Sequence, residues 1–275
     1  MDSLTVSIII PAYNAQAHLR ACVESVLKQS CPFLELIIVD NHSTDKTKEL
    51  ILGFARKDAR VRYIFEGQKS RGAARNAGIR EARGGLIAMV DSDCTAPEDW
   101  LEGLIRPIVE EGEQIVMGWE QPSANNACTV FIQEQNKRFL HQYRQGEHIS
   151  TLDTKNCAFR AEILKKYNFD PAIGNLEDCE SALRLRGKYQ IRFLDGVRVQ
   201  HSHKTSAWEW MKLQFNRGYW ARQIYKKHKG SEVMGHEVMF ESLKPLNMLT
   251  FPAWMAVQFL IRRRTHCSSF RKKVI

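Results

Sequence analysis

Disulfide and zinc-binding spacings are both missing from this sequence. It has 7 cysteines, an odd number, and no two of them are spaced as C-x-x-C, which argues against a disulfide framework and against a zinc site. The first residues also lack the basic start, apolar run and small-residue cleavage pattern of a secretory signal peptide. We therefore expect a cytosolic protein in a reducing compartment.

Internal repeats, low-complexity segments and a long apolar run are absent as well. The most apolar stretch, residues 245–261, contains Asn247, Thr250, Pro252 and Gln258, and spanning a bilayer needs about 20 mainly apolar residues. This stretch therefore favours an anchor at a membrane surface over a crossing. A length of 275 residues suits one α/β domain with an appendage.

The positive charge is confined to the C-terminal part of the chain. Residues 201–275 hold 14 Lys and Arg against 4 Asp and Glu, whereas the first 200 residues hold 26 against 27. This asymmetry indicates that only the C-terminal region meets an acidic surface, such as an anionic membrane or nucleic acid.

Hydrophobic periodicity predicts alternating strands and helices. Strands are expected at about 5–10, 35–40, 61–65, 86–90, 114–118, 155–160 and 190–200. Helices are expected near 16–29, 44–57, 71–83, 97–111, 126–145, 177–187 and 206–229, with Pro97 opening the fourth. This alternation predicts an α/β domain with a mixed, mostly parallel sheet and helices packed on it.

Polar residues directly follow three of the apolar strands. Residues 86–90 end on Asp91-Ser92-Asp93, residues 36–39 end on Asp40, and residues 6–10 lead into Pro11-Ala12-Tyr13-Asn14. Strand alternation would send Asp91 and Asp93 to one side, where both carboxylates can meet one divalent cation. Because ligands of parallel sheets collect beyond the carboxyl ends of the strands, the three strand ends should share one crevice.

Five motifs, in order, resemble those of family 2 glycosyltransferases with the GT-A fold, a Rossmann-like nucleotide-sugar-binding domain. The resemblance covers roughly residues 5–203 and is carried by residues 6–14, 37–45, 72–78, 91–93 and 177–178. It implies a nucleotide-sugar donor, an inverting transfer to a hydroxyl acceptor in glycan or cell-surface polysaccharide assembly, and a divalent cation, Mn²⁺ or Mg²⁺.

The resemblance also implies roles for donor-binding residues. Asp93 would bind the cation, with Asp91 on the nucleotide or the metal and His201 on the metal or diphosphate. Asp40 would accept the imide N–H of uracil, which admits a UDP-sugar or a dTDP-sugar and rejects cytosine. The remaining donor-side positions are Pro11 and Tyr13 around the base, Arg75 at base or phosphate, and Asn156 facing donor sugar or acceptor.

Asp178 matches the position of the family's catalytic base, and Glu177 beside it would hold acceptor or framework hydrogen bonds. Inversion by a single displacement needs one base, which removes the proton of the acceptor hydroxyl. Alternatively, both acids only complement the N-terminus of the helix expected at 177–187.

Two other functions remain open at this point. Asp91-Ser92-Asp93-Cys94-Thr95 fits the D-x-D-x-T pattern of aspartate-nucleophile phosphatases, although in those enzymes the motif usually follows the first core strand. A non-catalytic nucleotide-sugar-binding subunit of a membrane glycan-assembly system would keep the same fold without turnover.

The residues after 203 form the second predicted region, 204–275, beside a catalytic domain at 1–203. Between 206 and 229 aromatic residues alternate with Lys and Arg, a composition favoured at the headgroup level of membranes. We expect residues 206–273 to hold the enzyme on the inner face of the cell membrane, near a lipid-linked or glycan acceptor. Packing on the catalytic domain or in a dimer is the alternative, and nucleic-acid binding fits the apolar content less well.

Overall fold

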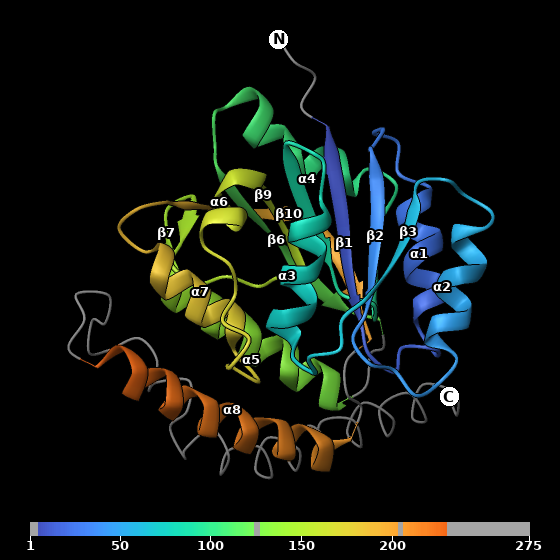
Figure 1. The fold of residues 1–275 in the computed structure, drawn as a ribbon. Helices are drawn as coiled ribbons and strands as arrows, with labels where there is room; N and C mark the ends of the chain where they lie inside the picture. The colour runs from blue at the N-terminus through green and yellow to red at the C-terminus, as the bar shows by residue number, and fades with distance from the viewer. Residues whose placement is uncertain (1–4, 124–126, 203–205, 230–275) are drawn as a thin grey trace, which may run out of the picture.

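A computed structural model describes residues 5–123, 127–202 and 206–229 of the chain. One 10-stranded sheet lies at its centre (Figure 1). The strands are β1 (Val6–Ala12), β2 (Glu35–Asp40), β3 (Val61–Phe65), β4 (Leu86–Val90), β5 (Cys94–Thr95), β6 (Ile115–Pro122), β7 (Arg144–Gln145), β8 (His148–Ile149), β9 (Asn156–Arg160) and β10 (Ile191–His201). Their order is β3-β2-β1-β4-β9-β6-β10-β8-β7, and β5 pairs with β10.

The long strands run in one direction except β9. Strands β3, β2, β1 and β4 are mutually parallel, and so are β6 and β10. β9 is inserted antiparallel between β4 and β6, and the two-residue strands β5, β7 and β8 make antiparallel pairs. The prediction of a mixed, mostly parallel sheet is confirmed.

Helices cover both faces of this sheet. They are α1 (Leu19–Leu27), α2 (Thr47–Ala55), α3 (Arg71–Glu81), α4 (Trp100–Glu110), α5 (Ala127–Tyr143), α6 (Ala161–Lys166), α7 (Glu177–Leu185) and α8 (Ala207–His228). Alternation along β1 sends Ile8 and Ile10 into the core under α1, α2 and α4, and sends Ile9 into the core under α3, α6 and α7. The domain is therefore a three-layer α/β/α structure.

Small residues let α3 approach the sheet closely. A Cβ added at Gly78 would lie 2.6 Å from a side-chain carbon of Ile9, and one added at Gly72 would lie 2.9 Å from the carbonyl oxygen of Asp170. Asn76 fixes the same helix to the segment before α7 through hydrogen bonds with the N–H and C=O of Phe169. Arg75, on this helix, is thereby held against the sheet.

Every strand and helix expected from periodicity is present within two or three residues at most ends. α6 and the short strands β5, β7 and β8 were not predicted, because six-residue and two-residue elements carry too few positions to show a period. Pro97 does not open its helix, which begins at Trp100. β6 continues to Pro122, four residues beyond its predicted end.

Helix α8 packs along one end of the domain, across the bottom of the view in Figure 1. Its Trp210, Ala221 and Ile224 are buried, and Ile224 packs with Ile173 and Leu183. Among the described helices, none is both long and apolar enough to cross a membrane. The predicted boundary at 203–204 and the remainder of the C-terminal region, 230–275, lie outside the described residues.

A buried carboxylate lies at the edge of the sheet opposite to the carboxyl ends of β1, β2 and β4. Glu35, the first residue of β2, is fully buried and accepts hydrogen bonds from Ser7 Oγ at 2.8 Å and Arg62 Nη1 at 2.6 Å. Arg83 adds its backbone N–H at 2.8 Å and its Nε at 3.0 Å. Burial alone would raise the pKa of Glu35, but these hydrogen bonds lower it to about 2.

We predict that Glu35→Gln lowers the free energy of unfolding at pH 7 by about 2 kcal/mol, because hydrogen bonds from arginine to a charged acceptor are lost. Since the pKa of Glu35 is lowered from 4.5 to about 2 on folding, its contribution is full above pH 4.5 and is lost towards pH 2. Urea denaturation across this range should show a shallower loss of stability in the variant.

The matched control is Glu24→Gln, which removes an exposed ion pair with Arg20 and should cost less than about 0.5 kcal/mol. Equal effects of the two substitutions would contradict the assignment of Glu35 as a buried anchor.

Candidate active site

The register of the sheet brings the predicted strand ends to one edge. Pro11 pairs with Val39 and Ala12 with Asp40, and Ile9 pairs with Met89 on the other side of β1. Continuing that register by two residues puts Asp91 level with Pro11. Because neighbouring strands lie about 4.8 Å apart, Asp40 at the end of β2 and Asp91 just after β4 belong to strands roughly 10 Å apart at the same edge of the sheet.

The predicted strand alternation of Asp91 and Asp93 is wrong. β4 ends at Val90, and the N–H of Cys94 donates to the carbonyl oxygen of Asp91 at 3.0 Å, which closes a turn. β5 then leaves this turn to pair with β10. Both acids still line one cavity, but a tight turn and not a strand brings them there.

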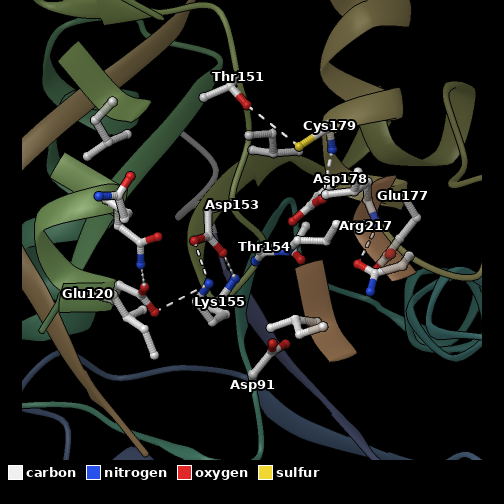
Figure 2. A pocket seen from close by; sticks show the side chains of 18 of the residues that line it. Asp91, Glu120, Thr151, Asp153, Thr154, Lys155, Glu177, Asp178, Cys179 and Arg217 are labelled. Carbon is white, nitrogen blue, oxygen red and sulfur yellow. Dashed lines mark hydrogen bonds and ion pairs between the residues drawn. The ribbon is translucent and has the colours of Figure 1, made fainter. Parts of the chain in front are cut away.

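A cavity of about 830 Å³ opens beside this turn (Figure 2). Its walls come from the sheet edge, α5, the start of α7 and α8, and it is large enough for a sugar substrate. Figure 2 shows Asp178, Glu177 and Arg217 gathered at one end and Glu120 at the other, with Lys155 between them. Side chains far apart in the sequence thus converge on one space.

A buried arginine joins the strand end to helix α7. Arg75 is 3% exposed; its Nη2 donates to Asp91 Oδ1 at 3.0 Å, and its Nη1 donates to Glu177 Oε1. Burial would lower the pKa of Arg75, but the charges of Asp91 and Glu177 raise it. The contact with Arg75 explains why the carboxylate of Glu177 can be buried.

Asp178 has a different environment from Glu177. It is half-buried at the start of α7, lines the cavity, and its Oδ1 accepts the N–H of Cys179 at 2.8 Å. Burial, followed by the nearby charges of Glu177 and Asp153, raises the pKa of Asp178 to about 6. A carboxylate with this pKa can accept a proton near neutral pH. Leu176, the residue before Glu177 at the start of α7, has a positive φ of 64°.

Asp93 and His201 form a candidate metal centre. His201 Nε2 lies 3.3 Å from Asp93 Oδ2, and His201 Nδ1 lies 2.7 Å from Glu120 Oε2. Burial would lower the pKa of His201, but the hydrogen bonds to Asp93 and Glu120 raise it to about 9. Burial would raise the pKa of Asp93, whereas the contact with His201 lowers it.

These donors fit a divalent cation such as Mn²⁺ or Mg²⁺. In the neutral form of His201, with Nδ1–H donating to Glu120, the lone pair of Nε2 faces Asp93, which is the arrangement of a metal-binding histidine oriented by a carboxylate. Carboxylate and imidazole suit these cations. Cys94 lies in the same group, but burial raises the pKa of its thiol, so it stays neutral. Asp91 is outside this group and is paired with Arg75.

Among the charged residues that line the cavity, Glu120, Asp153 and Lys155 lie together and were not predicted from the sequence. Lys155 Nζ lies 2.6 Å from Asp153 Oδ2 and 3.3 Å from Glu120 Oε2. Burial would lower the pKa of Lys155, but the charges of Asp153 and Glu120 raise it, and the net shift is upward. Glu120 follows the apolar run of residues 115–119, so the pattern that revealed Asp40 and Asp91 also marked it.

The predicted base-binding residues lie on the neighbouring strand ends and do not line the cavity. Asp40 is buried; its Oδ1 accepts the N–H of Ser43 at 3.0 Å and its Oδ2 accepts Tyr63 Oη at 3.4 Å. Tyr13 is 45% exposed, and Lys69 Nζ lies 4.4 Å from the centre of its ring.

Hydrogen bonds tie together the loops that carry these residues. Asn14 Oδ1 accepts the N–H of Thr44 at 2.8 Å, and Asn14 donates its own N–H to Ser43 Oγ at 3.0 Å. Asp45 Oδ1 accepts the N–H of Thr47 at the start of α2. The loops after β1 and β2 therefore form one platform.

The predicted role of Asn156 facing donor or acceptor is not supported. Its Oδ1 accepts Trp100 Nε1 at 2.9 Å, and its Nδ2 donates to the carbonyl oxygens of Trp119 at 2.8 Å and Val197 at 3.0 Å. The side chain is buried and is not among the cavity-lining residues. Asn156 instead joins β9 to β6, β10 and α4. His203, two residues after His201, lies outside the described residues.

Comparison with known proteins agrees with this geometry. Residues 7–168 match the family model described as glycosyl transferase family 2. This match covers more than half of the chain and includes the strand ends that carry Asp40, Asp91 and Asp93.

Curated relatives share the same region. The sequence is 38% identical over 114 residues to the glycosyltransferase GlyG of Streptococcus pneumoniae, covering 41% of this chain and 38% of GlyG. It is 28% identical over 221 residues to the uncharacterized glycosyltransferase EpsJ of Bacillus subtilis, covering 74% of this chain and 63% of EpsJ. The chain thus spans less than two thirds of either relative.

A solved structure shows the same fold. The glucosyl-3-phosphoglycerate synthase of Mycobacterium tuberculosis superposes with a TM-score of 0.62 at 18% identity, covering 82% of this chain and 78% of that chain. At this identity the likeness concerns the fold alone.

We predict that Arg75→Met destabilises the protein by about 3–5 kcal/mol, because it leaves the buried carboxylate of Glu177 and the partly buried carboxylate of Asp91 without their arginine partner. Adding Glu177→Gln removes one of these charges and should recover at least about 1 kcal/mol. Urea denaturation of the single and double variants measures both quantities.

Arg80→Met is the control, since Arg80 lies on the same helix but its side chain is 63% exposed, and it should cost less than about 1 kcal/mol. If Glu177→Gln made the Arg75→Met protein still less stable, the buried bridge would be disproved.

Proposed function

This chain belongs to family 2 of the glycosyltransferases, and we propose that it transfers a sugar, with inversion, from a UDP-sugar to a hydroxyl of a growing polysaccharide. The GT-A fold supplies the sheet edge on which donor and acceptor would meet. The observation that carries the proposal is the convergence of Asp178 and the pair Asp93 and His201 on one cavity, beside the strand end at Asp40.

The positions along the sheet edge support a particular placement of the donor. The platform at the ends of β1 and β2 would hold the base, and the turn at Asp91 would lie under the diphosphate. The sugar would then enter the cavity. The synthase from M. tuberculosis, which shares the fold, was crystallised with UDP and Mn²⁺, so this fold accommodates such a donor.

Asp40 supports uracil as the base. Each of its carboxylate oxygens has one protein donor and keeps a further lone pair, so it can accept the imide N–H. Thymine has the same N–H, and a dTDP-sugar would therefore also be admitted. Cytosine has an acceptor at that position, which would repel the carboxylate.

Asp93 and His201 are the residues that would hold a divalent cation, with Glu120 orienting His201. When bound, such a cation stabilises the negative charge that develops on the departing diphosphate. Arg75 does not replace it, because Asp91 and Glu177 already occupy its two terminal nitrogens. Arg71 also lines the cavity and makes no ion pair with another described residue, so its charge could meet a phosphate.

Asp178 is the proposed base. Its carboxylate would take the proton of the acceptor hydroxyl as that oxygen attacks the anomeric carbon from the side opposite to the diphosphate, which inverts the configuration there. Glu177 keeps Arg75 in place and raises the pKa of Asp178 through its charge. In this proposal Glu177 has the structural role and Asp178 the chemical one.

Neither alternative function is favoured by a specific observation. A phosphatase nucleophile at Asp91 would have to attack phosphate, but Asp91 is held by Arg75 at 3.0 Å, and the family match includes this turn. A non-catalytic binding subunit would have no use for an acid with a raised pKa lining the cavity.

We predict that Asp178→Asn lowers kcat for sugar transfer at least about 100-fold while UDP binding is unchanged, because only proton removal is lost. In the parent enzyme kcat should fall as pH drops through about 6, the pKa of Asp178, because only the ionised form accepts a proton. Radiolabelled transfer assays across pH 5–8 measure this.

Asp99→Asn, at an exposed acid outside the cavity, should leave kcat unchanged. Transfer by Asp178→Asn at the parent rate would remove the base from this role. Nucleotide binding without transfer in any form would favour the non-catalytic subunit.

We predict that Glu120→Gln weakens Mn²⁺ binding in the presence of UDP about 10- to 100-fold, because the carboxylate that orients His201 is neutralised. Titration calorimetry of Mn²⁺ into the UDP-bound protein reads this directly, without requiring an acceptor.

Glu113→Gln offers a matched control, since Glu113 Oε1 lies 3.2 Å from His148 Nε2 outside the cavity. Its effect on Mn²⁺ affinity should be absent. Equal Mn²⁺ affinity of the Glu120 variant and the parent would contradict the metal centre.

A further inference from the structure

Helix α8 has an outer face of aromatic and cationic side chains. Trp208, Phe215 and Tyr219 are 62%, 67% and 58% exposed, which is unusual for side chains of this size. The exposed residues spaced by three or four positions along the helix are Trp208, Lys212, Phe215, Tyr219, Arg222 and Lys226. This spacing puts them on a single stripe of the helix, which we call the outer stripe.

The outer stripe carries three positive charges and no acid. Lys212 Nζ lies 5.4 Å from the centre of the Trp208 ring, so cation and aromatic ring lie together at the surface. Among the exposed residues of α8, the one acid is Glu209, about 100° around the helix from Trp208.

The opposite face of α8 is occupied by the catalytic domain. Trp210 packs edge-on against Phe131 of α5 at a centroid distance of 5.3 Å, and Gly174 lies so close to Trp220 that an added Cβ would be 2.5 Å from its ring. Lys227 Nζ reaches Glu180 of α7 at 3.0 Å. With its inner face fixed in this way, α8 presents the outer stripe to the surroundings.

We propose that the outer stripe docks on an anionic lipid membrane, with α8 lying in the plane of the interface. Aromatic rings are favoured at the headgroup level, and Lys and Arg are attracted to anionic headgroups. The charge is complementary to such a surface, whereas a second copy of the chain would bring the same three cations against themselves. No described helix is suited to span the bilayer, so surface docking is the mode that the helix supports.

Docking in this orientation places the cavity next to the lipid. Phe215 and Tyr219 belong to the outer stripe and also line the cavity, together with Arg217 of the same helix. A helix is about 10 Å across, so the cavity lies roughly one helix diameter from the headgroups. Resting on the proposed function, this favours an acceptor linked to a lipid, whose glycan would enter the cavity along the edge of α8.

The test is flotation of the full chain with vesicles of phosphatidylcholine, with or without phosphatidylglycerol. The parent should float with the anionic vesicles and not with the neutral ones. The variant Lys212→Glu, Arg222→Glu, Lys226→Glu should partition about 100-fold less, because each cation near an anionic leaflet contributes roughly fivefold. None of these three residues lines the cavity.

A control variant with Lys48→Glu, Arg56→Glu and Lys57→Glu makes the same change of charge at exposed positions on α2 and just after it. These positions lie away from α8 in Figure 1, and this variant should float like the parent. Circular dichroism should show both variants folded. A second variant, Trp208→Ala with Phe215→Ala, should weaken flotation without changing charge.

Flotation of the Lys212, Arg222, Lys226 variant at the parent level overturns the proposal. So does a parent that fails to float and forms a dimer that this variant dissociates, since the stripe would then face a second copy. Thermal stabilisation by UDP and Mn²⁺, measured on the same samples, tests the proposed function separately. If UDP and Mn²⁺ did not stabilise a protein that still floats, the donor assignment would be contradicted and the membrane-docking proposal would remain supported.

Discussion

The contact of Arg75 with Asp91 and Glu177 is the interaction on which the site depends. One carboxylate lies in the turn directly after a strand and the other begins a helix 86 residues later, and both are buried or partly buried against the same guanidinium. Without that cation the two acids would repel one another, which would disfavour the start of α7 at the sheet edge. Because Asp178 is the next residue after Glu177, the position of the proposed base follows from a bridge that takes no part in the chemistry.

Much of the fold and part of the site could be predicted from local sequence pattern. Apolar runs identified the strands, and the acids after them identified the sheet edge, because parallel strands end together. However, this rule considers only residues that follow a strand, and it holds only for strands that run in the same direction. β9 runs against its neighbours, so the residues that precede it, Asp153 and Lys155, reach the same edge as those that follow β4 and β6. A strand's direction is set by its pairing partners, which local periodicity does not reveal.

The failures at Asn156 and at the turn after β4 have a related cause. A side chain's role depends on what surrounds it, and the three residues that hold the amide of Asn156 lie 37 to 56 positions away in the sequence. With all these partners supplied by the protein, Asn156 has no reason to face a substrate. Asp91 and Asp93 share a cavity for a similar reason: β5 must pair with β10, and the chain turns directly after β4 to reach it.

Helix α8 connects the chemistry of the cavity to the surface of the molecule. Trp210, Trp220 and Lys227 on its inner side contact the rest of the domain, and these contacts fix the rotation of α8 about its own axis. A helix fixed in this way would ordinarily turn its aromatic residues inward, where burial is favourable by about 25 cal/mol per Å² of apolar surface. In α8, Trp208, Phe215 and Tyr219 instead remain exposed beside cationic side chains. Exposure on this scale is expected where a partner removes the same surface from water, and its place beside the cavity means that the partner and the substrate would meet the enzyme at one side.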